Sequence, residues 1–232
     1  MIKPWLDLCR VSNLPTVWTN VLCAIVLSGS LAWPNFLRLV LSLSLFYAGG
    51  MCLNDICDVT NDRQQRPTRP LPSGKISITQ ASLFTVTLFA AGFAPLFFMP
   101  HPRAGWWGLA LLVVILVYDR CHKAHPWSVL LMAACRLLIF VIAAIAVTDS
   151  LTRPVAIAAA LQFAYVLIIS LTARWENRRG TPFPLPVIPW LIAGIALLDG
   201  IAMAMFVAPL WLLAGIGGMM LTRLGQRYVR GD

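Results

Sequence analysis

Long apolar runs, separated by short polar or proline-containing breaks, dominate the chain. Eight runs approach the roughly 20 residues that a helix needs to cross a bilayer. They cover residues 12–32, 36–56, 76–99, 104–120, 127–148, 154–174, 185–206 and 208–224. The fourth and eighth are short, so a count of seven or nine also fits. Prolines such as Pro34, Pro100 and Pro154 stand in the breaks and end helices because proline lacks a backbone donor. The pattern predicts an all-α, polytopic transmembrane bundle of about eight helices.

The composition agrees with this prediction. Hydrophobic residues make up 59% of the 232 residues and charged residues 12%, whereas a soluble domain usually carries about 25% charged residues. Residues 1–10 are charged and contain proline, and no persuasive cleavage site follows them. The first apolar run is therefore predicted to be a spanning helix and not a signal peptide. The six cysteines lie in or beside apolar runs, and we expect reduced thiols.

The positive charge is concentrated on one side of the predicted bundle. The net charge is +9, and eight alternating helices place 14 of the 18 Lys and Arg on the side of both termini. These are Lys3, Arg10, Arg63, Arg66, Arg69, Lys75, Arg120, Lys123, Arg174, Arg178, Arg179, Arg223, Arg227 and Arg230. The positive-inside rule predicts that both termini are cytoplasmic. In a bacterium this would be a multi-pass protein of the inner (plasma) membrane.

The most distinctive polar segment follows the second apolar run. Asn54, Asp58 and Asp62 are spaced i, i+4 and i+8, so they share one face if the helix continues. Crowded carboxylates repel one another unless a cation joins them, and Mg²⁺ is commonly held by one or two carboxylates together with substrate phosphates. The spacing favours a Mg²⁺–diphosphate site. The alternative is a solvated helix end, which like charges at i, i+4 disfavour.

Basic residues follow the acidic ones directly. Arg63, Arg66, Arg69 and Lys75 lie within a short segment that also contains prolines and a glycine. The guanidinium fork of arginine matches the geometry of phosphate oxygens. Carboxylates for a metal beside arginines for a phosphate form a coherent diphosphate site, although some of these charges serve only the positive-inside bias.

These residues resemble a known family. Asn54-Asp55-x-x-Asp58-x-x-x-Asp62, followed by Arg66-Pro-x-Arg69-Pro-Leu-Pro-Ser-Gly, is similar to the first aspartate-rich motif of the UbiA superfamily of intramembrane prenyltransferases. The resemblance implies one transmembrane domain over 1–232, a helical bundle around a central cavity open to the cytoplasmic side, and Mg²⁺ as the cofactor. It implies transfer of an isoprenyl group from a prenyl diphosphate to a lipophilic acceptor, with no nucleic acid as a partner.

The resemblance also assigns roles to residues. It implies that Asn54, Asp58 and Asp62 hold the metal and that Asp58 and Asp62 are catalytic in this role. It implies that the diphosphate is bound by basic and aromatic residues, and that two of these, Lys123 and Arg136, are catalytic because they stabilise the leaving group. The full set of diphosphate ligands is Arg10, Arg66, Arg69, Tyr118, Lys123 and Arg136. An arginine inside a membrane is costly and usually faces a polar cavity, although snorkelling to the interface is the alternative for Arg136. Asn20 is expected to face the cavity.

The chain departs from the family where a second aspartate-rich motif is expected, after the sixth helix. Only Glu176 is acidic there, and Thr172 and Arg174 stand beside it. This Thr-x-Arg-x-Glu feature is similar to the divergent EboC branch of the family. Glu176 is a candidate metal ligand, and Thr172 and Arg174 are candidate cavity residues. Asp199 in the seventh run is either a functional intramembrane acid or a residue near the far interface.

Three functions are compatible with this sequence. The first is Mg²⁺-dependent prenyl transfer to an aromatic, quinone-precursor or alcohol acceptor. The second is a catalytically silent protein that binds or moves an isoprenoid, which the degenerate second motif would explain. The third is an unrelated small transporter with the acidic cluster as its cation site. No dinucleotide fingerprint or P-loop is present.

Overall fold

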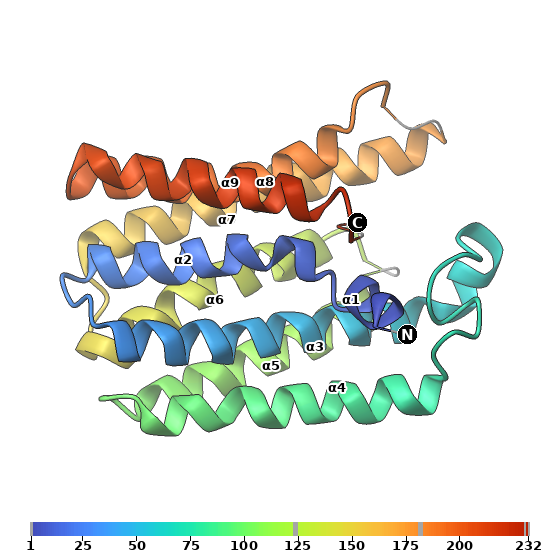
Figure 1. Ribbon diagram of the computed structural model, residues 1–232, viewed down its shortest axis with the longest axis horizontal. Helices are drawn as coiled ribbons and strands as arrows, with labels where there is room; N and C mark the ends of the chain where they lie inside the picture. The colour runs from blue at the N-terminus through green and yellow to red at the C-terminus, as the bar shows by residue number, and fades with distance from the viewer. Residues whose placement is uncertain (1, 123–124, 181–182, 230, 232) are drawn as a thin grey trace.

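A computed structural model describes residues 2–122, 125–180, 183–229 and 231 of the protein. This part of the chain forms nine α-helices, three short 3₁₀ helices and no strand. The α-helices are α1 (Lys3–Leu8), α2 (Leu14–Leu27), α3 (Trp33–Gln65), α4 (Ile78–Phe93), α5 (Arg103–Cys121), α6 (Ser128–Thr148), α7 (Arg153–Arg179), α8 (Val187–Phe206) and α9 (Leu212–Gly225). Helices α2 to α9 run side by side along the long axis of the molecule (Figure 1). The eight apolar runs thus each form a helix, and α1 is a short additional helix ahead of them.

Proline and glycine set several helix boundaries. Pro15, Pro34 and Pro154 each lie in the first turn of a helix, where the missing N–H would have no intrahelical partner. The first apolar run was predicted to continue to residue 32, but α2 ends at Leu27, and Gly29 turns the chain with a φ of 68°. The helix after it, α3, continues well past the apolar run to Gln65, as the shared face of Asn54 and Asp58 requires.

The protein is a multi-pass membrane protein. Among the described residues, six helices are long and apolar enough to cross a membrane: α3, α4 with its 3₁₀ extension to Phe98, α5, α6, α7 and α8. Helix α2 with the turn before it, and α9, are shorter. Large apolar side chains such as Leu83, Phe97 and Met205 are 70–76% exposed on the outside of the bundle, where lipid would cover them.

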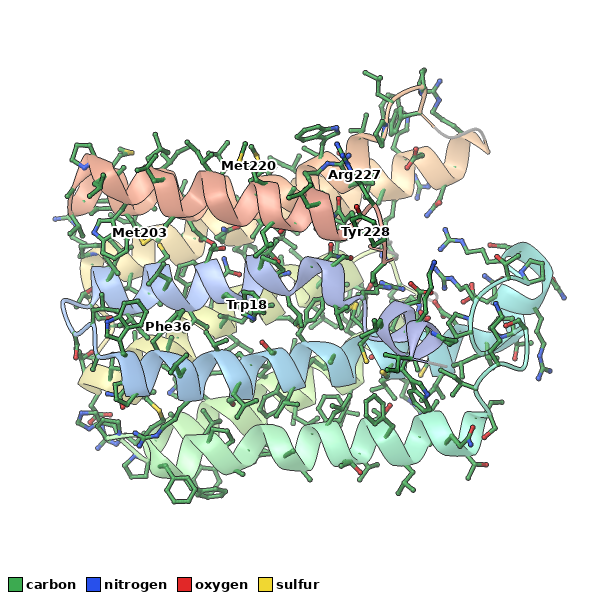
Figure 2. All side chains as sticks on the ribbon, in the orientation of Figure 1. Trp18, Phe36, Met203, Met220, Arg227 and Tyr228 are labelled. Atoms are coloured by element: carbon green, nitrogen blue, oxygen red, sulfur yellow. The ribbon has the colours of Figure 1, made fainter. Side chains whose placement is uncertain are left out.

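Both chain ends lie at the same end of the bundle (Figure 1), as an even number of passes predicts. In Figure 2, Arg227 and Tyr228 mark this end, while Phe36 and Met203 lie toward the opposite one. Because alternate helices run in the same direction, the C-terminal ends of α3, α5 and α7 meet here. The fold therefore collects three polar segments that are distant in the sequence at one end of the bundle.

Candidate functional site

A cavity of 490 Å³ lies between the helices and is lined mainly by α3, α5, α6, α7 and α8. Its lining is divided along the bundle axis. Apolar side chains from the middle of the helices form the inner part, including Leu43, Phe46, Leu111, Ile139 and Ile195. Polar side chains line the part near the chain ends: Arg10, Tyr118, Asp119, His122 and Arg174, whereas Arg136 lies deeper, beside Tyr47. The cavity is suited to a molecule with a charged head and an apolar tail.

Two hydrogen bonds join α3 to α5 beside this cavity. Asn54 Nδ2 donates to Asp119 Oδ1 over 3.0 Å, and one turn later His122 Nε2 lies 3.1 Å from Asp58 Oδ1. The hydrogen bond to Asp58 raises the pKa of His122, which favours the protonated ring as the donor. Asn54 and Asp58 thus face the same neighbouring helix, as their i, i+4 spacing predicts.

Asp62 has a different partner. It accepts a hydrogen bond from Arg69 of the segment after α3, and Arg69 also lies 3.5 Å from Asp55. Asp55 in turn binds Arg10 over 2.9 Å. Asp55, Asp62 and Arg69 are each at most 5% exposed. These ion pairs hold the segment that carries the arginines against the end of α3, so two of the predicted diphosphate ligands, Arg10 and Arg69, already bind carboxylates of the protein.

Arg136 belongs to a polar network inside the bundle. Its guanidinium donates to Asn20 Oδ1 and to Thr16 Oγ1, each over 2.9 Å. Asn20 donates to both carboxylate oxygens of Asp199 over 2.8 and 3.0 Å, and Gln162 donates to the same carboxylate over 2.8 Å. The network connects α2, α6, α7 and α8. Arg136 lines the cavity, whereas Asp199 is 1% exposed in the interior of the bundle and not at the far interface.

The remaining predicted site residues are dispersed. Tyr118 lines the cavity and stacks on His122, and Arg174 lines it while donating to Ser128 Oγ over 2.7 Å and to the Pro126 carbonyl. Arg66 is exposed, and Lys123 lies outside the described residues. Thr172 donates to the Ile168 carbonyl, and Glu176 accepts from the Phe183 amide. Neither of these two is among the residues that line the cavity.

Three residues at this site did not emerge from the sequence as site residues. Asp55 pairs with Arg10 and Arg69. Its seven-residue spacing from Asp62 corresponds to two helical turns, which indicates that the two acids share a face of α3. Asp119 stands next to Tyr118 at the end of a predicted spanning run, which places an acid at the polar end of the bundle. Nothing in the local sequence pairs His122 with Asp58, which lies 64 residues away. Within the described residues, no group of three His, Cys, Asp or Glu side chains is gathered as a metal site.

Comparison with known proteins gives a consistent match over most of the chain. The sequence model of the UbiA prenyltransferase family matches residues 13–225. A digeranylgeranylglyceryl phosphate synthase of Sulfolobus acidocaldarius is 34% identical over 122 residues, which cover 51% of this chain and 42% of the relative. A polyprenyl transferase of Emericella nidulans is 33% identical over 103 residues, which cover 43% and 31%. The matched regions thus span less than half of these relatives.

Solved structures resemble the whole bundle. A digeranylgeranylglyceryl phosphate synthase superposes with a TM-score of 0.67 at 17% identity, and the match covers 98% of this chain and 95% of the other. A UbiA homologue of Archaeoglobus fulgidus, bound to GPP and Mg²⁺, superposes with a TM-score of 0.65 at 16% identity and covers 97% of each chain. At these identities the likeness establishes the shared fold.

Proposed function

This chain belongs to the UbiA prenyltransferase family, and we propose that it transfers an isoprenyl group from a prenyl diphosphate to a lipophilic acceptor in the membrane. The observation that carries the proposal is the cavity with an apolar inner part and a cationic outer part. An isoprenyl tail fits the first and its diphosphate the second. The solved relative bound to GPP and Mg²⁺ supports the same class of donor substrate.

The residues of α3 suit a divalent metal. Asn54 and Asp58 carry oxygen donors on successive turns of α3 and bind Asp119 and His122, which line the cavity; hard cations such as Mg²⁺ prefer such donors. Mg²⁺ bound there would neutralise the diphosphate and make it a better leaving group. Asp62 is proposed as a third ligand. Its carboxylate binds Arg69 in this structure and would have to release Arg69 to bind the metal.

The cationic side chains stabilise the leaving group. Arg136 is half-buried beside Tyr47, whose ring centroid lies 5.7 Å from the guanidinium carbon. Held by Asn20 and Thr16, this guanidinium needs no rearrangement when negative charge grows on the diphosphate, which is the requirement for electrostatic catalysis. Arg174 contributes positive charge from α7, and Lys123 and Arg66 are proposed to reach the diphosphate from the adjacent segments. The apolar inner cavity keeps water from the allylic cation.

The acceptor is proposed from the relatives. Several are digeranylgeranylglyceryl phosphate synthases, so a glyceryl phosphate lipid alcohol is the first acceptor to test, ahead of aromatic and quinone-precursor acceptors. Both termini are proposed to be cytoplasmic because they lie at one end of the bundle (Figure 1), to which most of the Lys and Arg positions belong. Water-soluble diphosphates would then enter from the cytoplasm.

A second function is favoured by one specific observation. The single acid near the end of α7, Glu176, binds the amide of Phe183 instead of lining the cavity. A protein without a second acidic motif at the cavity is also suited to binding an isoprenoid diphosphate without turnover.

The test uses purified protein in lipid nanodiscs with Mg²⁺, radiolabelled geranylgeranyl diphosphate and each class of acceptor. We expect a labelled lipid product with the wild type and a loss of at least 100-fold in rate for Asp58→Ala, because the metal loses a ligand. Arg103→Gln is the control, since Arg103 pairs with Asp149 at the opposite end. Full activity of Asp58→Ala would refute the proposal, and diphosphate binding without any product would favour the second function.

A further inference from the structure

One carboxylate at the cavity lacks a full set of partners. Asp119 is 5% exposed and lines the polar part of the cavity. Its Oδ1 accepts from Asn54, but its Oδ2 is buried without a hydrogen-bond partner in the part of the chain that the structure describes. Leaving a buried acceptor unsatisfied usually costs about 1–3 kcal/mol, and more for a charged group. Such an atom in a native protein commonly indicates a bound ion or water.

The neighbouring cations are engaged with other acids. Arg10 pairs with Asp55, and the ring of His122 lies between Asp58 Oδ1 and the backbone oxygen of Asp119 itself. Among the described residues, no salt bridge reaches the Asp119 carboxylate. Buried charges in proteins are paired or bind metals. The Asp119 carboxylate is therefore the one near these pairs without a cationic partner in the part of the chain that the structure describes, and its residue lines the cavity.

Asp119 lies beside the residues proposed to hold Mg²⁺. The C-terminal ends of α3 and α5 run in the same direction, and the 3.0 Å bond from Asn54 to Asp119 and the 3.1 Å bond from His122 to Asp58 fix their register. Asp119 thus lies across from Asn54 and within one turn of the level of Asp58. His122 binds one oxygen of Asp58, in the way that a hydrogen-bonded neighbour orients a metal-binding carboxylate.

We infer that Asp119 is a metal ligand of this protein, which completes with Asn54 and Asp58 a Mg²⁺ site that bridges α3 and α5. The inference rests on the proposed function. While Arg69 holds Asp62, two carboxylates and one amide oxygen leave coordination positions for diphosphate oxygens and water, which is how Mg²⁺ is usually bound. With this assignment, α5 supplies a metal-binding carboxylate in addition to Asp58 of α3. Glu176, at the end of α7, accepts a hydrogen bond from the Phe183 amide instead.

The experiment measures metal binding without turnover. Mn²⁺, which is paramagnetic and replaces Mg²⁺ in oxygen-donor sites, is titrated into purified protein in nanodiscs with a non-cleavable thio analogue of geranylgeranyl diphosphate, and bound Mn²⁺ is measured by electron paramagnetic resonance. Asp119→Asn keeps an acceptor for Asn54 and removes the charge. We expect it to weaken Mn²⁺ binding at least 10-fold, since loss of even an outer partner of a metal ligand commonly costs 10–100-fold.

Matched variants make the outcome decisive. Asp149→Asn is the control, because Asp149 is paired with Arg103 at the other end of the bundle and its left-handed φ of 51° suits asparagine. Asp119→Ser, which also keeps an oxygen acceptor, replaces Asp119→Asn if that variant fails to fold. Mn²⁺ affinity within twofold of the wild type would overturn the inference. If Asp58→Asn still abolishes binding in that case, the proposed function stands, whereas a wild type that binds no Mn²⁺ with the analogue would overturn both.

Discussion

The buried network around Asp199 makes a quantitative prediction. Asp199→Ala removes the acceptor of three hydrogen bonds, two from Asn20 and one from Gln162, at a site that is 1% exposed. Hydrogen bonds to charged groups contribute about 1.5–3 kcal/mol in soluble proteins, but interhelical bonds in membranes average about 0.6 kcal/mol. For three bonds we expect a value between these two estimates, a loss of about 2–4 kcal/mol in the free energy of unfolding. The loss arises because Asn20 and Gln162 keep buried donors without an acceptor.

The assay is thermal unfolding followed with a thiol-reactive dye. The chain carries its own probes, because Cys23 and Cys52 are fully buried and become reactive only when the bundle opens. For a chain of this length, about 2–4 kcal/mol lowers Tm by roughly 4–16 °C. Ser42→Ala is the matched control, since it removes one buried hydrogen bond, from Ser42 to the Gly92 carbonyl. It should cost about 0.5–1.5 kcal/mol.

The network around Asp199 is also predicted to affect ligand binding, which a purely structural network would not do. Asn20 connects Asp199 to Arg136, so Asp199→Ala should also loosen Arg136 and weaken binding of the diphosphate analogue. Asp199→Asn retains one acceptor and should recover part of both losses. A Tm for Asp199→Ala within about 1 °C of the wild type would refute the reasoning, because three buried hydrogen bonds would then contribute nothing.

Two further predictions concern the ends and the packing of the bundle. Arg69→Ala leaves two buried carboxylates without their shared cation and should lower the free energy of unfolding by about 3–5 kcal/mol, measured by chemical or thermal unfolding. Arg66→Ala is the control, because Arg66 is exposed and its loss should change that free energy by less than about 0.5 kcal/mol. Equal effects of the two substitutions would contradict the ion-pair assignment. Gly215→Val should cost about 1–3 kcal/mol or more, because a Cβ there would lie 2.7 Å from Gly200 Cα. Gly217→Ala is its control, since a Cβ at Gly217 meets nothing within 4 Å, and a stable Gly215→Val variant would mean that α8 and α9 do not pack this closely.

Much of the architecture could be predicted from local pattern. Each of the eight apolar runs forms a helix, and prolines such as Pro34 and Pro154 mark the first turns. The i, i+4 spacing of Asn54 and Asp58 correctly placed both side chains toward one neighbour. The placement of both termini at one end also followed from the number of runs. These features depend on residues within a few turns of one another.

The pairing of charges could not be predicted in the same way. Asp62 shares the spacing of Asn54 and Asp58, yet it binds Arg69, while Asp55 binds Arg10 from 45 residues away. The segment after α3 folds back against the end of that helix, and its path decides which of the acids Arg69 contacts. Asp119 appeared in the sequence only as the neighbour of Tyr118, and its importance follows from the contact with Asn54 across two helices.

The sequence by itself determined the membrane bundle, its polar end and the chemistry available there, because hydrophobic run length, proline position and charge bias act locally along the chain. The tertiary structure decided which carboxylates already hold arginines, which one keeps an oxygen without a partner, and that Arg136 is held in the cavity wall by Asn20 and Thr16. The physical reason is that hydrogen bonds and ion pairs act over about 3 Å, so the packing of helices that are distant in the sequence selects the partners.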